Sequence, residues 1–171
     1  TGIGDLNDIL LLPVTGKVPL NKGTKEDMQT GYGSYFSHEN EISKPGYYSV
    51  WLDKYKVKAE LTASERVGFH RYSFNSTDDS HVLLDLADGL GWDKPVKTYI
   101  KKISGNTIVG YRHSKGWADD QRLFFAIEFS QPISAISLYD SISALKGSEA
   151  VGTRLKAVID FSTLKNKQVL V

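Results

Sequence analysis

Hydrophobic and polar residues alternate along much of the chain with a period of two, which is the pattern of half-buried β-strands. Residues 56–62 (KVKAELT) alternate most strictly, and this predicts an antiparallel strand with one solvated face. Residues 47–52 (YYSVWL) are aromatic and β-branched and follow a Pro-Gly pair, which predicts a strand that begins after a turn. Residues 67–74 and 81–86 have similar patterns, and the short polar segments between these strands predict a meander.

The second half of the chain continues this pattern. Further strands are expected at residues 98–103, 107–112, 123–129, 133–139, 155–161 and 168–171. Gly105 favours a tight turn between the first two of these, since glycine tolerates a positive φ. The best helix candidate, residues 141–149, is short and is interrupted by Gly147. About ten strands and at most one short helix predict an all-β chain folded as an antiparallel β-sandwich. Residues 15–35 are expected to form a long surface loop.

The composition limits the class of protein. The 171 residues correspond to a single domain with enough length for a sizeable core. A net charge of +1 argues against nucleic acid as a partner. No apolar run approaches the ~18 residues of a membrane-spanning helix, and the lack of cysteine excludes disulfides and thiolate chemistry. The chain begins at Thr1 without an initiator Met and stops in a strand-like segment, so we expect a domain trimmed at both ends.

One candidate binding site lies in the glycine-flanked segment 110–121. Trp117 stands there beside Asp119 and Asp120, and sugar sites combine an aromatic face with carboxylates that bind hydroxyl groups. Adjacent side chains of an extended segment point to opposite faces, so the two aspartates are not expected to act as a general acid and base pair. Two interpretations stay open: a contact with sugar or a neighbouring domain, or a simple packed corner.

A second polar cluster comprises His38, Glu39 and Asn40, just before a predicted strand. It is either a turn with a satisfied histidine or a loop that directs its side chains at a ligand or a neighbouring domain. We expect no metal site here, because His38 has no partner at a known ligand spacing. No catalytic constellation is evident in the sequence, and the residues alone therefore indicate a binding module or a scaffold domain.

Four blocks of sequence, in the same order, resemble the bacterial α-mannosidases of glycoside hydrolase family 92. The first block is residues 1–13 (TGIGDLNDILLLP), and the second joins residues 37–41 (SHENE) to 45–48 (PGYY). The third joins residues 60–63 (ELTA) to 66–72 (RVGFHRY), and the fourth is residues 116–121 (GWADDQ). Four ordered blocks over nearly the whole chain make this a specific resemblance.

The resemblance implies a β-sandwich of the galactose-mutarotase-like, supersandwich type, packed on a larger C-terminal (α/α)6 catalytic barrel. It implies an exported bacterial enzyme (periplasmic, cell-surface or secreted) that is exo-acting and removes mannose from α-mannosides such as N-glycans. Hydrolysis would proceed with inversion, and α-1,2 linkages are the favoured substrates. The enzyme would require calcium, and its ligands and the catalytic residues are expected in the barrel, so that none lies in this chain.

On this interpretation the isolated chain is inactive and serves as a scaffold and as one wall of the substrate cleft. Its partners would be its own C-terminal barrel and a mannose-containing glycan. The alternative is a non-catalytic carbohydrate-binding module, which would bind mannosides through Trp117 without the barrel. A purely structural dock for the barrel is a third interpretation, and it predicts an exposed apolar surface.

Overall fold

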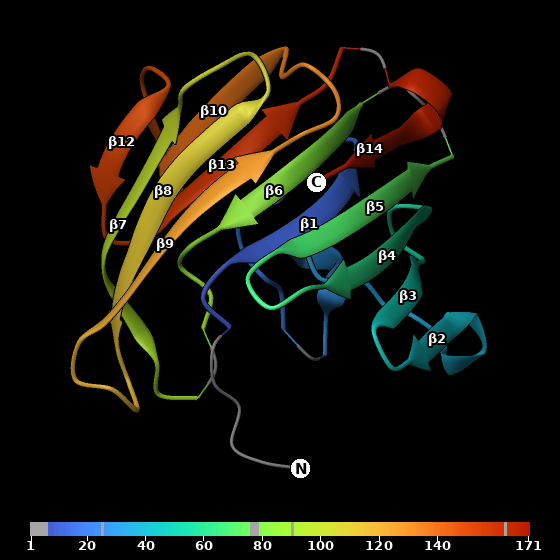
Figure 1. Cartoon of the computed structure of the whole chain (residues 1–171), viewed down its shortest axis with the longest axis horizontal. Coiled ribbons are helices and arrows are strands. Elements are labelled where there is room, and N and C mark those ends of the chain that lie inside the picture. Colours follow the sequence, from blue (N-terminus) through green and yellow to red (C-terminus); the bar gives the residue numbers. More distant parts are fainter. Residues whose placement is uncertain (1–6, 25, 76–78, 90, 163) are drawn as a thin grey trace.

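Three antiparallel β-sheets make up the fold (Figure 1). The computed structural model describes residues 7–24, 26–75, 79–89, 91–162 and 164–171. These residues form fourteen β-strands and three short 3-10 helices, η1 (Met28–Thr30), η2 (His38–Asn40) and η3 (Lys165–Lys167). The expected all-β sandwich class is therefore confirmed, with more strands than the alternation of the sequence predicts.

The first two sheets are built from nine strands. Sheet 1 has the order β1 (Leu10–Thr15), β6 (Ser80–Asp85), β13 (Leu155–Asp160), β10 (Ala135–Asp140) and β11 (Ser143–Leu145). Sheet 2 has the order β12 (Glu149–Gly152), β7 (Lys94–Lys102), β8 (Thr107–Lys115) and β9 (Gln121–Glu128). Strand β9 is one edge of sheet 2, and its only ladder within the described residues is with β8.

Sheet 3 has the order β14 (Gln168–Leu170), β5 (Gly68–Phe74), β4 (Val57–Ala63), β3 (Tyr47–Leu52) and β2 (Glu41–Lys44). Of the meander expected for residues 47–86, the first three strands, β3, β4 and β5, form the central part of this sheet. The fourth, β6, pairs with β1 and β13 in sheet 1 instead, where its nearly continuous run of buried residues is covered on both faces, so the expectation was wrong for this strand. In β4, Val57 and Ala59 face inward and Lys58 faces outward, while Glu60 is also buried. The short strand β14 is one edge of this sheet, and among the described residues its ladder is with β5 alone.

One hydrophobic core joins the three sheets. Sheet 1 contributes Val82 and Leu84, which are fully buried, and packs them against Ile100 and Ile108 of sheet 2 and Val57 of sheet 3. Sheet 1 is therefore one layer of the sandwich, and sheets 2 and 3 together form the facing layer. Strands β9 of sheet 2 and β14 of sheet 3 are the edges that meet in this second layer.

The helix candidate at residues 141–149 was wrong. Strands β11 and β12 occupy this segment instead. Two residues in it have a left-handed backbone, Ser141 with φ 58° and Gly147 with φ 91°, and such residues cannot continue a right-handed helix.

The loop expected at residues 15–35 covers the outer face of sheet 1. Tyr32 is buried there against Leu83 and Val158, and its hydroxyl donates to Asp85 at 3.0 Å. Burial next to this carboxylate raises the pKa of Tyr32 above its ordinary value. The loop is therefore held by its own buried side chain and is part of the folded structure.

Candidate functional site

Two exposed tryptophans lie together at the end of sheet 2. Trp92 comes from the connection between β6 and β7, and Trp117 from the bend between β8 and β9. Their ring centroids are 5.9 Å apart, and the side chains are 52% and 70% exposed. The two segments touch closely, because a Cβ atom on Gly116 would lie 2.8 Å from the Cα of Asp93. The pair presents an aromatic surface of the type that binds the C–H faces of sugars or a partner protein.

A fully buried arginine holds this end of the sheet together. Arg112 of β8 forms ion pairs with Asp8 at 2.7 Å and with Asp93, the residue after Trp92. Its guanidinium also donates to the carbonyls of Leu86 at 3.0 Å and Asp88 at 3.1 Å. The N-terminal segment, the connection that carries Trp92 and strand β8 therefore converge on one side chain. Buried arginine is rare without such pairing, so the network is a specific feature of this end of the molecule.

The network extends to the β8–β9 bend. Gln121, the first residue of β9, donates from its amide to both carboxylate oxygens of Asp8 at 2.8 Å. The segments on either side of Trp117 are thus fixed, by Gly116 on one side and Gln121 on the other. A binding surface fixed in this way loses little conformational entropy when a ligand binds.

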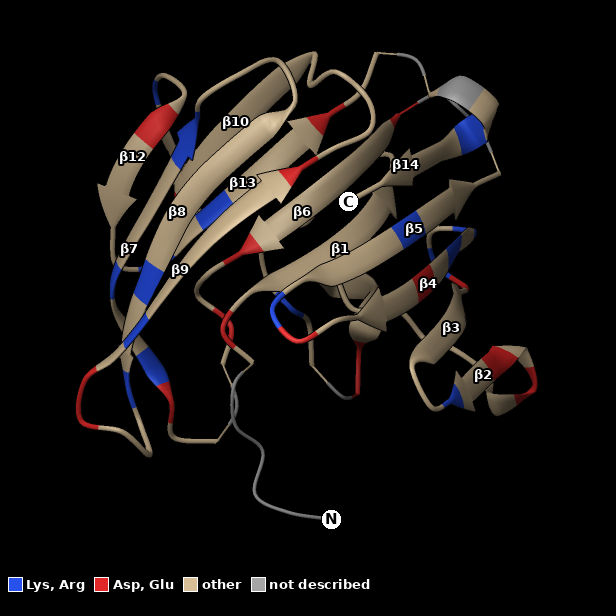
Figure 2. Ribbon diagram, in the orientation of Figure 1, with Lys and Arg blue, Asp and Glu red and all other residues tan. Residues whose placement is uncertain are grey.

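Asp119 and Asp120 are exposed in the same bend, on the arm that leads into β9 (Figure 2). Arg122 pairs with Asp120 at 2.8 Å, and its hydrogen bond lowers the pKa of this carboxyl. Residues 116–120 form bends and not the extended segment expected, so the argument from opposite strand faces does not apply here. Asp120 stays ionised at neutral pH and is paired, which suits it to accept hydrogen bonds from hydroxyl groups and not to donate a proton.

The second candidate cluster lies elsewhere. His38 and Glu39 belong to η2, which the Ser37 side chain caps by accepting from the amide of Glu39. The nearby strand β2 lies far from the β8–β9 bend (Figure 1), so the two polar clusters do not form one site. His38 Nδ1 lies 2.6 Å from Glu41, whose other oxygen accepts from Tyr48 at 2.6 Å.

Hydrogen bonds from Tyr48 and His38 lower the pKa of Glu41. Glu41 was not predicted as the partner of His38, although its spacing of three residues fits the single turn of η2. The segment His38–Asn40 is thus a capped turn in which His38 is paired. That these residues also contact a ligand or a neighbouring domain stays a prediction.

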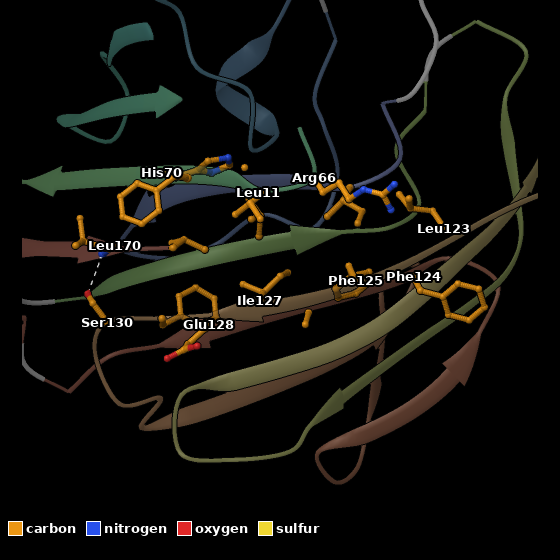
Figure 3. Close-up of a pocket in the computed structure, with 17 residues that line it drawn as sticks. Leu11, Arg66, His70, Leu123, Phe124, Phe125, Ile127, Glu128, Ser130 and Leu170 are labelled. Carbon is orange, nitrogen blue, oxygen red and sulfur yellow. Dashed lines mark hydrogen bonds between the residues drawn. The ribbon is translucent and has the colours of Figure 1, made fainter. Parts of the chain in front are cut away.

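An apolar groove of about 750 Å³ lies between sheets 2 and 3 (Figure 3). Strand β9 forms one wall, the beginning of β5 forms the other, and Ile9 and Leu11 line the base. The end of the chain closes it at Leu170 and Val171. The walls carry Val67, Phe69, Leu123, Phe124, Phe125 and Ile127, together with Arg66, His70 and Glu128.

Comparison with solved structures identifies close relatives of this chain. The family GH92 α-mannosidase BT3965 from Bacteroides thetaiotaomicron superposes with a TM-score of 0.91 at 34% identity. The match covers 99% of this chain and 24% of BT3965. A model of the glycosyl hydrolase family 92 N-terminal domain matches residues 1–171. The chain belongs to this family.

Two further members of the family share the fold of this N-terminal domain at 20% identity. They are the glycosyl hydrolase ccman5, with a TM-score of 0.78, and the inverting mannosidase BT2199 from Bacteroides thetaiotaomicron, with a TM-score of 0.73. Each match covers 95% of this chain and about a fifth of the other, 22% and 20%. A comparison with curated proteins gave no match. The chain therefore spans about a quarter or less of these relatives.

The sequence blocks that carry the family resemblance meet in pairs in the folded domain. The first and fourth blocks join where Gln121 binds Asp8, next to Arg112. The second and third join at Glu60, which accepts from Tyr47 at 2.7 Å and pairs with Arg71 at 2.7 Å. These hydrogen bonds, with that from Arg71 the strongest cause, lower the pKa of Glu60 to about 2. Residues 1–6 of the first block lie outside the described residues.

The described part of this family 92 domain contains no group of three or more His, Asp or Glu side chains that could hold a metal ion. Asp85, which begins a short acidic stretch, accepts a hydrogen bond from Tyr32 and forms an ion pair with Lys156 at 3.2 Å. The described residues also include no helix long and apolar enough to cross a membrane.

Proposed function

We propose that the chain is the N-terminal β-sandwich of an exo-acting α-mannosidase that hydrolyses α-mannosides, α-1,2-linked mannose being the favoured substrate. The observation that carries this proposal is the match of 99% of the chain to α-mannosidase BT3965 at 34% identity. A related structure of BT3965 holds mannoimidazole, which supports a mannose-binding site in that enzyme. Export from a bacterial cell is part of the same proposal and rests on the family resemblance.

The chain's role in such an enzyme would be that of a scaffold and of one wall of the substrate cleft. The end of sheet 2 that carries Trp92 and Trp117 is the part best suited to face the cleft, because its aromatic rings are exposed and Arg112 holds the residue after Trp92, Asp93, by an ion pair. Trp117 would contact an apolar sugar face, while Asp119 and Asp120 would accept from sugar hydroxyls. Another part of the protein would then contact His38, Glu39 and Asn40, since they lead directly into β2, which lies away from this end (Figure 1).

Catalysis itself would belong to a C-terminal (α/α)6 barrel. Inversion needs two carboxyl groups about 6.5–9.5 Å apart, one acidic and one basic, on either side of the sugar. Asp119 and Asp120 near Trp117 are exposed, and the hydrogen bond from Arg122 lowers the pKa of Asp120, so Asp120 is not suited to donate a proton. Calcium would likewise be bound outside this chain, since the described residues do not provide a ligand set that fits it.

The stereochemistry, linkage preference and metal dependence can be tested on the full-length product of the parent gene. We expect release of mannose from α-1,2-mannobiose, initial formation of the β-anomer by NMR, and loss of activity with a calcium chelator that added calcium restores. Formation of the α-anomer would contradict inversion. Equal rates on α-1,2, α-1,3 and α-1,6 disaccharides would contradict the linkage preference.

The exposed tryptophan pair also favours a second candidate function, a non-catalytic carbohydrate-binding module. This alternative predicts that the 171-residue chain binds α-methyl mannoside by itself and that Trp117→Ala abolishes the binding. Calorimetry with no detectable heat at millimolar sugar would exclude it and leave the role of a cleft wall.

A further inference from the structure

The groove between sheets 2 and 3 lies between two strands that each lack a neighbour along part of their length, as far as the described residues show. Strand β14 pairs with the second half of β5, from Arg71 to Ser73, and ends at Leu170. The first half of β5, with Gly68 and Phe69, faces the groove beyond that point. Across the groove lies β9, whose ladder within the described residues is with β8 alone.

The backbone of β5 is set to continue this pairing into the groove. His70 and Val171 exchange two hydrogen bonds, from His70 N to Val171 O at 2.9 Å and from Val171 N to His70 O at 3.0 Å. In an antiparallel ladder, every second residue directs its N–H and C=O to the same neighbour. Gly68 therefore directs its backbone groups into the groove on the same side as His70.

The backbone of β9 faces the groove in the same way. Ser130, just after β9, donates its N–H to Leu170 O at 2.9 Å, and the Ser130 hydroxyl accepts from Leu170 N (Figure 3). Phe129 N–H points to the opposite side and donates to Asn106 O at 2.9 Å. By the same alternation, every second residue of β9 before Ser130 directs its N–H and C=O groups into the groove. These residues are Glu128, Ala126 and Phe124.

These bonds fix the direction of a strand that would fit. Strand β14 runs antiparallel to β5, and Leu170 meets Ser130 at the end of β9. A strand that continues from Val171 would lie beside Gly68 of β5 on one side. On the other side it would run along β9 in the direction from Glu128 to Phe124. It is therefore antiparallel to both walls and can satisfy the unpaired backbone groups of each.

We propose that the groove binds a β-strand formed by the residues that directly follow Val171 in the longer enzyme. This strand would join sheets 2 and 3 into one sheet that covers sheet 1. Val171 already lies at the mouth of the groove with its backbone bonded to His70, so such residues enter without a turn. A second copy or a separate peptide would have to lose its translational freedom to bind there. The proposal does not depend on the substrate of the enzyme.

The side-chain pattern of this strand follows from β14. Val169 is fully buried and Leu170 is half-buried, so odd positions face sheet 1. The second and fourth residues after Val171 should then be apolar, because they would pack on Leu11, Phe125 and Ile127. The first and third should tolerate polar side chains, since they lie on the same outer face as Glu128. A charged residue at both inward positions in the parent gene would contradict the proposal.

Residue-resolved amide hydrogen exchange tests the pairing. We compare the 171-residue chain with the full-length protein and follow the amides of Phe124, Ala126 and Glu128. They should exchange at least about 100-fold more slowly in the full-length protein, because they gain hydrogen bonds there. Equal rates in both proteins would overturn the proposal. Slowing that rises with the concentration of the 171-residue chain would also overturn it, and would identify a second copy as the occupant.

A proline substitution separates strand pairing from simple coverage by another domain. Ala126→Pro removes only the N–H that faces the groove and leaves the bonds of β9 to β8 intact. The change in the denaturation midpoint should be clearly larger in the full-length protein than in the 171-residue chain, because an unpaired edge tolerates proline. Ala126→Thr keeps the N–H and should leave both midpoints nearly unchanged. Equal shifts for Ala126→Pro in the two proteins would refute the pairing.

Discussion

The role of Arg112 can be tested by a substitution that keeps its volume and removes its charge, Arg112→Met. The arginine is fully buried, and Asp8, its partner at 2.7 Å, is 3% exposed. Loss of one member of a buried ion pair leaves the other charged and unpaired, which costs about 3–5 kcal/mol. The carbonyls of Leu86 and Asp88 also lose their donor. We therefore expect the free energy of unfolding to fall by about 4 kcal/mol, a large part of the ~5–15 kcal/mol typical of a domain.

Urea denaturation followed by tryptophan fluorescence measures this loss. The matched control is Arg122→Met on the neighbouring strand, where the arginine and Asp120 are both more than half exposed. An exposed pair contributes less than about 1 kcal/mol, so the control should unfold near the wild-type midpoint. The double variant with Asp8→Asn should recover part of the stability lost in Arg112→Met. A loss below about 1 kcal/mol for Arg112→Met would refute the account of the network.

Three further substitutions probe the domain. Glu60→Gln should lower the free energy of unfolding at pH 7 by about 1–3 kcal/mol. The pKa of Glu60 is lowered to about 2 by Arg71, so its contribution is present above pH 4.5 and is lost towards pH 2. Denaturation at several pH values should give a flatter profile for Glu60→Gln, and an unchanged profile would contradict this. Gly116→Ala should destabilise the domain, because the added methyl group clashes with Asp93, and an unchanged melting temperature would show that the two loops do not touch. Trp117→Ala should leave stability within about 0.5 kcal/mol but raise KM for mannobiose in the full-length enzyme, and an unchanged KM would remove Trp117 from the cleft.

The class of fold could be predicted from local patterns. Alternation over residues 56–62 gave strand β4 almost to the residue, since a half-buried strand records its two faces in its own sequence. The helix candidate at residues 141–149 failed because the conformations of Ser141 and Gly147 are set by the strands that they connect. Local propensity is a weak guide where tertiary contacts decide the backbone.

Only part of the candidate site could be predicted from the sequence. Trp117 was singled out from its local composition, but Trp92 was missed because its position beside Trp117 depends on the fold of two separate connections. Arg112 was not recognised either, since its ion-pair partner Asp8 is 104 residues away. Contacts of this range leave no trace in the spacing of a single sequence. The structure also shows that the sequence blocks shared with family 92 meet in two hydrogen-bonded networks. Some of their residues therefore have a role in holding the fold together.

The central claim is that this chain is a non-catalytic N-terminal part of an α-mannosidase. Release of mannose from α-1,2-mannobiose, measured side by side for the 171-residue chain and the full-length protein at equal molar concentration, tests it most directly. The account predicts turnover by the full-length protein and none above background by the chain, even when the chain is shown to be folded by circular dichroism. Turnover by the isolated folded chain, or by neither protein, would contradict it.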